Sequence, residues 1–398
     1  TSFSGDGSSL TGIGASFGNS SINTSGIITA TALVPTTGQL SHRNIVINGD
    51  FTVAQRGSQS TSAGFQTVDR FAVYYTGTDE SPTQVIFNVD PPGAYHLPTT
   101  GPHPRKEGFR KAFGITNGNQ TSGAGAGDYI YISHKIEAQD MAQCGWNYTD
   151  TNSFITLSFW VKSSVAQNFY GYLISKDGSS YLYPFETGSL SADTWTKVTK
   201  TISGNSNLTF NNDNGTGFEL VIAPFFGTSK TGSVSLNAWG AYSSSVRVPD
   251  MTSTWYTTSG ATFEYTGVQL EVGSQATPFE HRSFGEELSL CQRYYEHSYD
   301  YGTYPGASTD YGSVMFLSNR NTGTPHTMLR YAVPKRSAPT VTAYTHQGNA
   351  GMRNLDAGVD YSGYTFNRNG QMGCTAYPTA TPVIGQFIQF HYTAVSEL

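Results

Sequence analysis

The chain has 398 residues, of which 13% are charged and 13% aromatic, and its formal net charge is −6. Few charges together with 25 Tyr, 23 Phe and 44 Gly favour an all-β fold of short strands and turns. Lys and Arg form no run longer than a dipeptide, which argues against nucleic-acid binding, and no apolar stretch approaches the ~18–20 residues of a membrane span.

Residues 1–43 are rich in Gly, Ser and Thr, with isolated apolar residues between them. A single chain of this composition does not bury enough apolar surface to offset the entropy of ordering. The apolar residues nevertheless recur regularly, and the pattern of residues 1–3 returns at residues 31–33. We expect a repetitive β stalk or attachment segment in which several chains share one core. A disordered leader is the alternative.

Residues 44–283 are expected to form one long β domain. Residues 44–51 are typical of a short strand followed by an Asn-Gly-Asp turn. Residues 154–161 alternate between apolar and other residues, which is the period of a half-buried strand. Further strands are expected at residues 128–136, 194–202, 217–226 and 261–272. Many short antiparallel strands in one long segment predict a jelly-roll β-sandwich.

Residues 284–297 carry the one clear helical pattern. Glu286 and Glu287 suit the positive end of a helix dipole, and Leu288 and Cys291 fall on one apolar stripe. We expect this helix to link the jelly roll to a second β domain.

Residues 298–398 return to strands and turns and predict a second, smaller β-sandwich. Its strands are expected at residues 312–317, 328–333, 339–345, 361–367 and 387–394. The complete prediction is an all-β chain with a stalk, a central jelly roll, a linking helix and a C-terminal sandwich.

Several segments resemble those of a known class of proteins. They are NIVINGDF at 44–51, ITLSFWVK at 155–162, the join at 266–295, the stretch at 331–340 and the ending at 394–398. These segments resemble phage tail-fibre-like structural proteins that contain a carbohydrate-binding-module-like jelly roll. The leader SFSGDGSSLTGI resembles repeats in structural proteins of marine and cyanobacterial phages.

The resemblance implies a virion structural protein that is made in the bacterial cytoplasm. It implies a homotrimeric tail fibre that attaches to host-surface glycan and contacts other virion proteins through residues 1–43. The tail is favoured over the capsid surface as its location. Related β-domains decorate capsids, so a capsid decoration or tail adaptor protein without a receptor is an alternative. A glycan-degrading tailspike is another.

No catalytic or metal motif is present in the sequence. It contains no His-Glu-x-x-His, Gly-x-Ser-x-Gly, Walker or dinucleotide-binding pattern, and its three cysteines lie far apart. The adjacent carboxylates Asp79-Glu80 and Glu286-Glu287 do not have the arrangement of a glycosidase pair, although a pair built from distant loops stays open. Residues 212–215 predict an Asx turn rather than a calcium loop. We therefore expect no catalytic residue, no metal, no cofactor and no enzymatic activity.

Sugar binding uses aromatic faces that pack on the C–H groups of a pyranose ring. Five aromatic residues lie in polar, turn-rich contexts and are the candidates for such a role: Trp146, Trp239, Tyr242, Trp255 and Tyr256. Packing in a core or between subunits is the alternative for each of them.

Overall fold

The protein is all-β, as the composition predicts, in its computed structural model. The structure describes residues 41–89, 101–319 and 325–398. The stalk predicted for residues 1–43 lies outside the described residues except for its last three positions. All of the described residues belong to one compact unit. The boundaries expected between domains therefore stay predictions.

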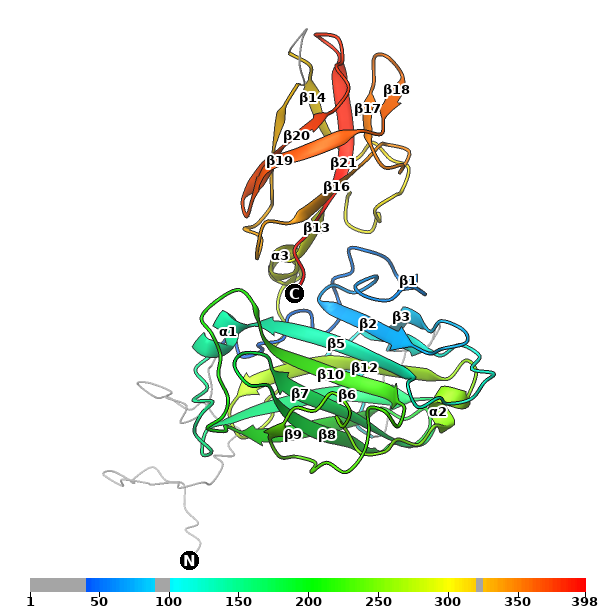
Figure 1. The fold of residues 1–398 in the computed structure, drawn as a ribbon, viewed down its shortest axis with the longest axis vertical. Helices are drawn as coiled ribbons and strands as arrows, with labels where there is room; N and C mark the ends of the chain where they lie inside the picture. Colours follow the sequence, from blue (N-terminus) through cyan, green and yellow to red (C-terminus); the bar gives the residue numbers. More distant parts are fainter. Residues whose placement is uncertain (1–40, 90–100, 320–324) are drawn as a thin grey trace, which may run out of the picture. The chain divides into compact units, whose positions relative to one another are not determined.

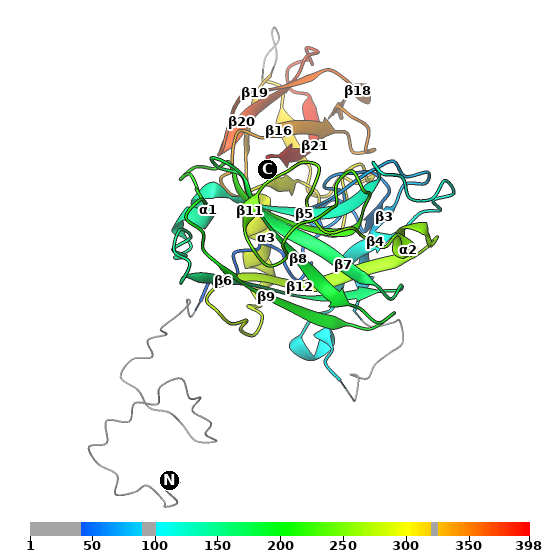
Figure 2. The same ribbon diagram turned by 60° about the horizontal axis from the view of Figure 1, so that its bottom comes forward.

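Two six-stranded antiparallel sheets form a first β-sandwich (Figures 1 and 2). In the order of pairing, the first sheet contains β1 (Gln59–Ser60), β3 (Thr83–Asn88), β4 (Lys111–Thr116), β12 (Thr262–Val272), β6 (Phe154–Ser163) and β9 (Thr196–Ser203). The second contains β11 (Gly240–Ala241), β8 (Tyr181–Ser189), β7 (Asn168–Ser175), β10 (Thr216–Phe226), β5 (Tyr129–Glu137) and β2 (Phe71–Thr76). The chain passes repeatedly from one sheet to the other, as in the predicted jelly roll.

Strand β6 shows how the sequence builds this sandwich. Ile155, Leu157 and Phe159 alternate along the strand and are fully buried in the main core, as their spacing predicts. The opposite face of β6 is also buried, because Trp160 packs with Phe109 in a separate cluster on the first sheet. The strand is therefore covered on both faces rather than half-buried.

The segment at residues 44–51 contains no strand, which corrects the prediction. Val46 of this segment is nevertheless fully buried in the main core. The Asn44 side chain takes the place of a backbone ladder. Its amide oxygen accepts hydrogen bonds from the backbone N–H of Val46 and of Leu270, and its amide nitrogen donates to the Val268 carbonyl. A side chain that bonds the backbone in this way competes with strand pairing.

The helices are short in the described part of the chain, and none of them has the length and apolarity to cross a membrane. They are the 3-10 helix η1 (Pro104–Glu107), α1 (Ala138–Gln143), α2 (Thr254–Thr257) and α3 (Phe284–Gln292). The linking helix predicted at residues 284–297 therefore ends five residues early. It ends there because Tyr295, an aromatic residue suited to strands, pairs with Val395 instead.

The C-terminal residues form a second β-sandwich, as predicted. Its larger sheet contains β13 (Tyr295–His297), β21 (Phe387–Val395), β17 (Met352–Asn354) and β18 (Val359–Tyr361), with β14 (Val314–Leu317) and β16 (Thr340–Tyr344) also paired to β21. Its smaller sheet contains β15 (Thr327–Arg330), β20 (Gly373–Pro378) and β19 (Tyr364–Gly370). Leu329 and Cys374 of the smaller sheet share one core with Ile388 and Phe390 of β21.

Charged side chains connect the first sandwich to Arg293 and to Glu397 near the C-terminus. Glu397 forms ion pairs with Arg56, at 2.7 Å, and with Arg70. Arg293, just after α3, donates two hydrogen bonds to the carboxylate of Glu137 at 2.6 and 2.8 Å. These contacts join parts of the chain that are separated by more than 150 residues in sequence. We call the group Arg56, Asp69, Arg70 and Glu397 the junction cluster.

Candidate functional site

The outer face of the second sheet carries a row of tyrosines. Along β5, Ile130 and Ile132 are buried between the sheets, so Tyr129 and Tyr131 point to the opposite side. Strand pairing places Tyr74 of β2 directly beside Tyr131. The Tyr131 ring centroid lies 5.4 Å from that of Tyr74 and 5.4 Å from that of Tyr129. Three half-buried rings therefore adjoin on two neighbouring strands.

The row continues onto β10 and β7. Phe226 lies 5.7 Å from Tyr131 between ring centroids and stacks on Tyr172 at 6.3 Å. Arg247 lies over the Phe226 ring at 5.8 Å, and Val248 packs in the same cluster, so this end of the row is covered. We call the half-buried rings Tyr74, Tyr129 and Tyr131 the tyrosine face.

Polar groups lie beside the tyrosine face on the same side of the sheet. Ser133 is the next outward residue of β5 after Tyr131, and its hydroxyl donates to the Glu219 carboxylate at 2.6 Å. Lys176 forms an ion pair with the other oxygen of Glu219 at 2.6 Å. Burial raises the pKa of Tyr131 and of Tyr74 further above the ordinary tyrosine value, which already lies well above neutral pH, so both hydroxyls are protonated. The face thus combines aromatic area with tyrosine hydroxyls and lies beside a buried carboxylate that is already paired.

The structure buries three of the five aromatic residues proposed from the sequence. Trp146, Trp255 and Tyr256 are 3%, 0% and 1% exposed, so none of them has a ring face open to a sugar. The Trp255 indole N–H donates to the Thr262 carbonyl at 3.0 Å, and Tyr256 stacks on Phe225 at 4.3 Å. All three rings pack in the main core although their neighbours in the sequence are polar, which agrees with the alternative of core packing. These residues belong to the core.

Trp239 and Tyr242 are partly exposed. The Trp239 indole N–H donates to the Ser203 carbonyl at 2.8 Å, and its ring packs against Tyr183 and Phe218 of the main core. Tyr242 packs in the cluster on the outer side of the second sheet, which also contains Tyr129 and Tyr131. Only Tyr242 of the five candidates therefore lies on the same side as the tyrosine face.

The tyrosine face itself was missed in the sequence. The alternation Tyr129-Ile130-Tyr131-Ile132 was available as a signal, because period 2 with isoleucine on one side puts tyrosine on the other. The contribution of Tyr74 could not be predicted from the local sequence, because it depends on the pairing of β2 with β5, which lie more than fifty residues apart.

Other predicted features can be placed in the structure. The Asx turn is confirmed, because the Asp213 carboxylate accepts from the backbone N–H of Gly215 at 2.9 Å. Among residues 41–89, 101–319 and 325–398, no group of three or more His, Cys, Asp or Glu side chains could hold a metal ion. Asp79 accepts hydrogen bonds from Ser122, and Glu80 from the backbone of Asn119, so these adjacent carboxylates serve a loop.

No family model matches the chain. No curated protein matches it either. Solved structures with some similarity include the enzymatically active domain of tailspike protein 4 from bacteriophage CBA120, at 12% identity over 58% of this chain and 21% of that chain, with a TM-score of 0.30. A putative sugar-binding protein from Bacteroides thetaiotaomicron is 11% identical over 58% of this chain and all of that chain, with a TM-score of 0.30.

A third similar structure is the N-terminal cellulose-binding domain of β-1,4-glucanase C from Cellulomonas fimi. It is 10% identical over 56% of this chain and all of that chain, with a TM-score of 0.26. At these identities and TM-scores the similarities carry no argument about what this chain binds. The assignment of the fold rests on the strands and their pairing alone.

Proposed function

We propose that this chain is a non-enzymatic structural protein of a phage particle, of the tail-fibre type, and that its tyrosine face binds host-surface glycan. The tyrosine face is the observation that carries the proposal. Adjacent half-buried tyrosines offer flat apolar area to sugar C–H groups, and their hydroxyls offer hydrogen bonds to sugar hydroxyls. The resemblance of several segments to tail-fibre-like proteins supports the placement in a virion.

The proposed mechanism is multivalent attachment. In a homotrimer, three tyrosine faces would act together, and several fibres on one particle would multiply weak contacts into firm attachment. Residues 1–43 would connect the fibre to other virion proteins. No bound cofactor or metal takes part in this mechanism.

Replacing tyrosines of the tyrosine face by alanine tests the proposal. We expect Tyr74→Ala and Tyr131→Ala each to weaken polysaccharide binding about 2- to 10-fold, because an aromatic contact is worth ~0.5–1.5 kcal/mol beyond its area. Binding is measured on an array of bacterial surface polysaccharides with the full chain. Tyr131→Phe keeps the aromatic ring and should therefore lose less binding affinity than Tyr131→Ala.

Tyr311→Ala is the matched control, because Tyr311 is 78% exposed and lies in the C-terminal domain. Circular dichroism establishes that each variant is folded. Equal loss of binding in Tyr311→Ala, or full binding by Tyr131→Ala, would refute the role of the tyrosine face. If the wild-type chain binds no polysaccharide while immunogold labelling finds it in virions, the capsid decoration or tail adaptor role replaces the adhesin. Release of oligosaccharides would instead establish a glycan-degrading tailspike.

A further inference from the structure

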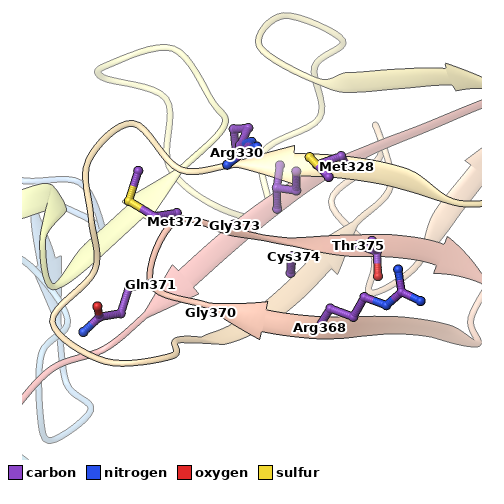
Figure 3. Close-up of a pocket in the computed structure, with 10 residues that line it drawn as sticks. Met328, Arg330, Arg368, Gly370, Gln371, Met372, Gly373, Cys374 and Thr375 are labelled. Carbon is purple, nitrogen blue, oxygen red and sulfur yellow. The ribbon is translucent and has the colours of Figure 1, made fainter.

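The smaller C-terminal sheet carries a shallow cavity of about 430 Å³ on its surface (Figure 3). This volume lies within the ~300–1,000 Å³ that is usual for sites of small ligands. Strand β15 contributes Met328 and Arg330 to the lining, β19 contributes Arg368, and the turn between β19 and β20 contributes Met372. None of these residues belongs to the tyrosine face, which lies on the first sandwich.

Two glycines lie in one row with Arg330 at the cavity. Strand pairing places Arg330 opposite Gly373 and Gly373 opposite Gly370, so the three strands meet in one row across the sheet. Two of the three positions have no Cβ atom. Arg330 is exposed and lines the cavity next to these two glycines.

Arg368 reaches the same cavity through a distorted backbone. The register of β19 against β20 shifts between Asn367 and Gly370, which marks a β-bulge. Arg368 lies in this bulge with a φ of 51°, in the left-handed region that glycine normally occupies. Bulges re-aim side chains, and a strained conformation held by a large residue points to a functional use of that side chain.

Neither arginine has an acidic partner within the described residues. Other cations of the same domain are paired: Arg353 with Asp360 at 2.9 Å, and Lys335 with Glu296 at 2.5 Å. The cavity therefore offers two unpaired guanidinium groups. At its edge Met328 and Met372 are 63% and 52% exposed, which adds apolar surface.

We propose that this cavity binds a carboxylate-bearing sugar unit of an acidic polysaccharide. A guanidinium matches the planar carboxylate with two parallel hydrogen bonds, and methionine side chains adapt to the apolar face of a pyranose ring. The proposal rests on the proposed glycan-binding function and adds the class of ligand and a second site on another domain. The chain would then hold a polysaccharide at the tyrosine face by ring contacts and at this cavity by charge.

Polygalacturonate and its fully methyl-esterified form are the probes, because they differ only in the charge of the carboxyl group. Binding is measured with the full-length wild-type chain, the double variant Arg330→Gln/Arg368→Gln, and Tyr131→Ala. Salt is kept at ~0.15 M, where charges are screened beyond about 8 Å. Arg110→Gln is the control, because it removes one exposed positive charge from the first sandwich.

We expect the wild-type chain to bind polygalacturonate at least about tenfold more tightly than the ester, since hydrogen bonds to charged groups are the stronger class. The double arginine variant should lose this preference, while Arg110→Gln and Tyr131→Ala should keep it. Unchanged preference in the double variant, or equal binding of both polymers by the wild type, would overturn the acidic-sugar site. The proposed glycan-binding function would still be supported in either case if Tyr131→Ala lost binding to another polysaccharide that the wild type binds.

Discussion

Burial changes the protonation of Asp69, one of the four side chains of the junction cluster. Asp69 is fully buried and accepts hydrogen bonds from Arg56, at 2.7 Å, and from Gln55, at 2.7 Å. Burial nevertheless raises the pKa of Asp69 to about 7, because loss of water outweighs the attraction of the Arg56 guanidinium. Arg70 is 1% exposed, and its guanidinium lies 3.4 Å from the centroid of the Tyr294 ring.

Asp69→Asn should change how stability depends on pH. Between the ordinary pKa of 3.8 and the raised value of about 7, folded Asp69 holds a proton that the unfolded chain has released. Its contribution to stability is therefore complete below about pH 4 and is lost as the pH rises through about 7. We expect the free energy of unfolding of the wild type to fall relative to Asp69→Asn as the pH is raised from about 5 to about 8.

Urea unfolding of both proteins across this range measures the difference. Glu286→Gln is the control, because its carboxylate is exposed and lies outside the junction cluster. The quantity compared is the free energy of unfolding of the wild type minus that of Asp69→Asn. If this difference stays constant or increases with pH, the expected titration of Asp69 is contradicted.

At the scale of elements, strands whose residues alternate clearly between apolar and polar were predictable from the sequence. Features that depend on pairing with a distant strand were not. Strands β6, β10, β12 and β21 lie within two residues of their predicted positions, because their alternation reflects burial directly. The helix at residues 284–297 was predicted too long, because no local signal shows that Tyr295 pairs with a strand a hundred residues away. The place of Tyr74 in the tyrosine face and of Arg330 beside Gly373 depends on pairing between strands more than forty residues apart, which local alternation does not show.

Strand β12 contains a bulge that requires glycine. Its register against β6 shifts between Thr266 and Gln269, and Gly267 has a φ of 65° in the left-handed region. A Cβ atom at this position would lie 2.5 Å from the ring of Phe109. We expect Gly267→Ala to cost roughly 2–4 kcal/mol of unfolding free energy, from backbone strain and overpacking together.

Gly260→Ala separates these two causes. Gly260 has a φ of 72°, but a Cβ atom there would meet no other atom within 4 Å. Gly260→Ala should therefore lower the free energy of unfolding only through backbone strain, by roughly 1–2 kcal/mol, in the same urea unfolding experiment. Equal losses in the two variants would mean that the contact with Phe109 has no energetic effect.

At the scale of the whole molecule, the junction cluster joins the two sandwiches by buried ion pairs. Glu397 has a side chain that is only 7% exposed and pairs with two arginines that are likewise buried. Removing a buried ion's partner leaves an uncompensated charge and typically costs about 3–5 kcal/mol. Within the described residues, Glu397 is therefore one of two carboxylates, with Glu137, that form ion pairs between the two sandwiches.

Glu397→Ala should separate the unfolding of the two sandwiches. We expect scanning calorimetry to show one transition for the wild type and two for Glu397→Ala, because Arg56 and Arg70 lose their shared partner. Glu286→Ala removes an exposed carboxylate and should keep the single transition. A single transition at the wild-type temperature in Glu397→Ala would show that the junction cluster does not couple the domains.

The position of the last strand in each sandwich has a consequence for synthesis on the ribosome. Strand β12 is the last of the first sandwich to be translated, yet it lies between β4 and β6. Strand β21 is likewise the last of the second sandwich, and β13, β14, β16 and β17 all pair with it. Neither sheet can close on a growing chain until its final strand has emerged. A chain released early therefore lacks the centre of a sheet and exposes unpaired strand edges, which are prone to aggregation.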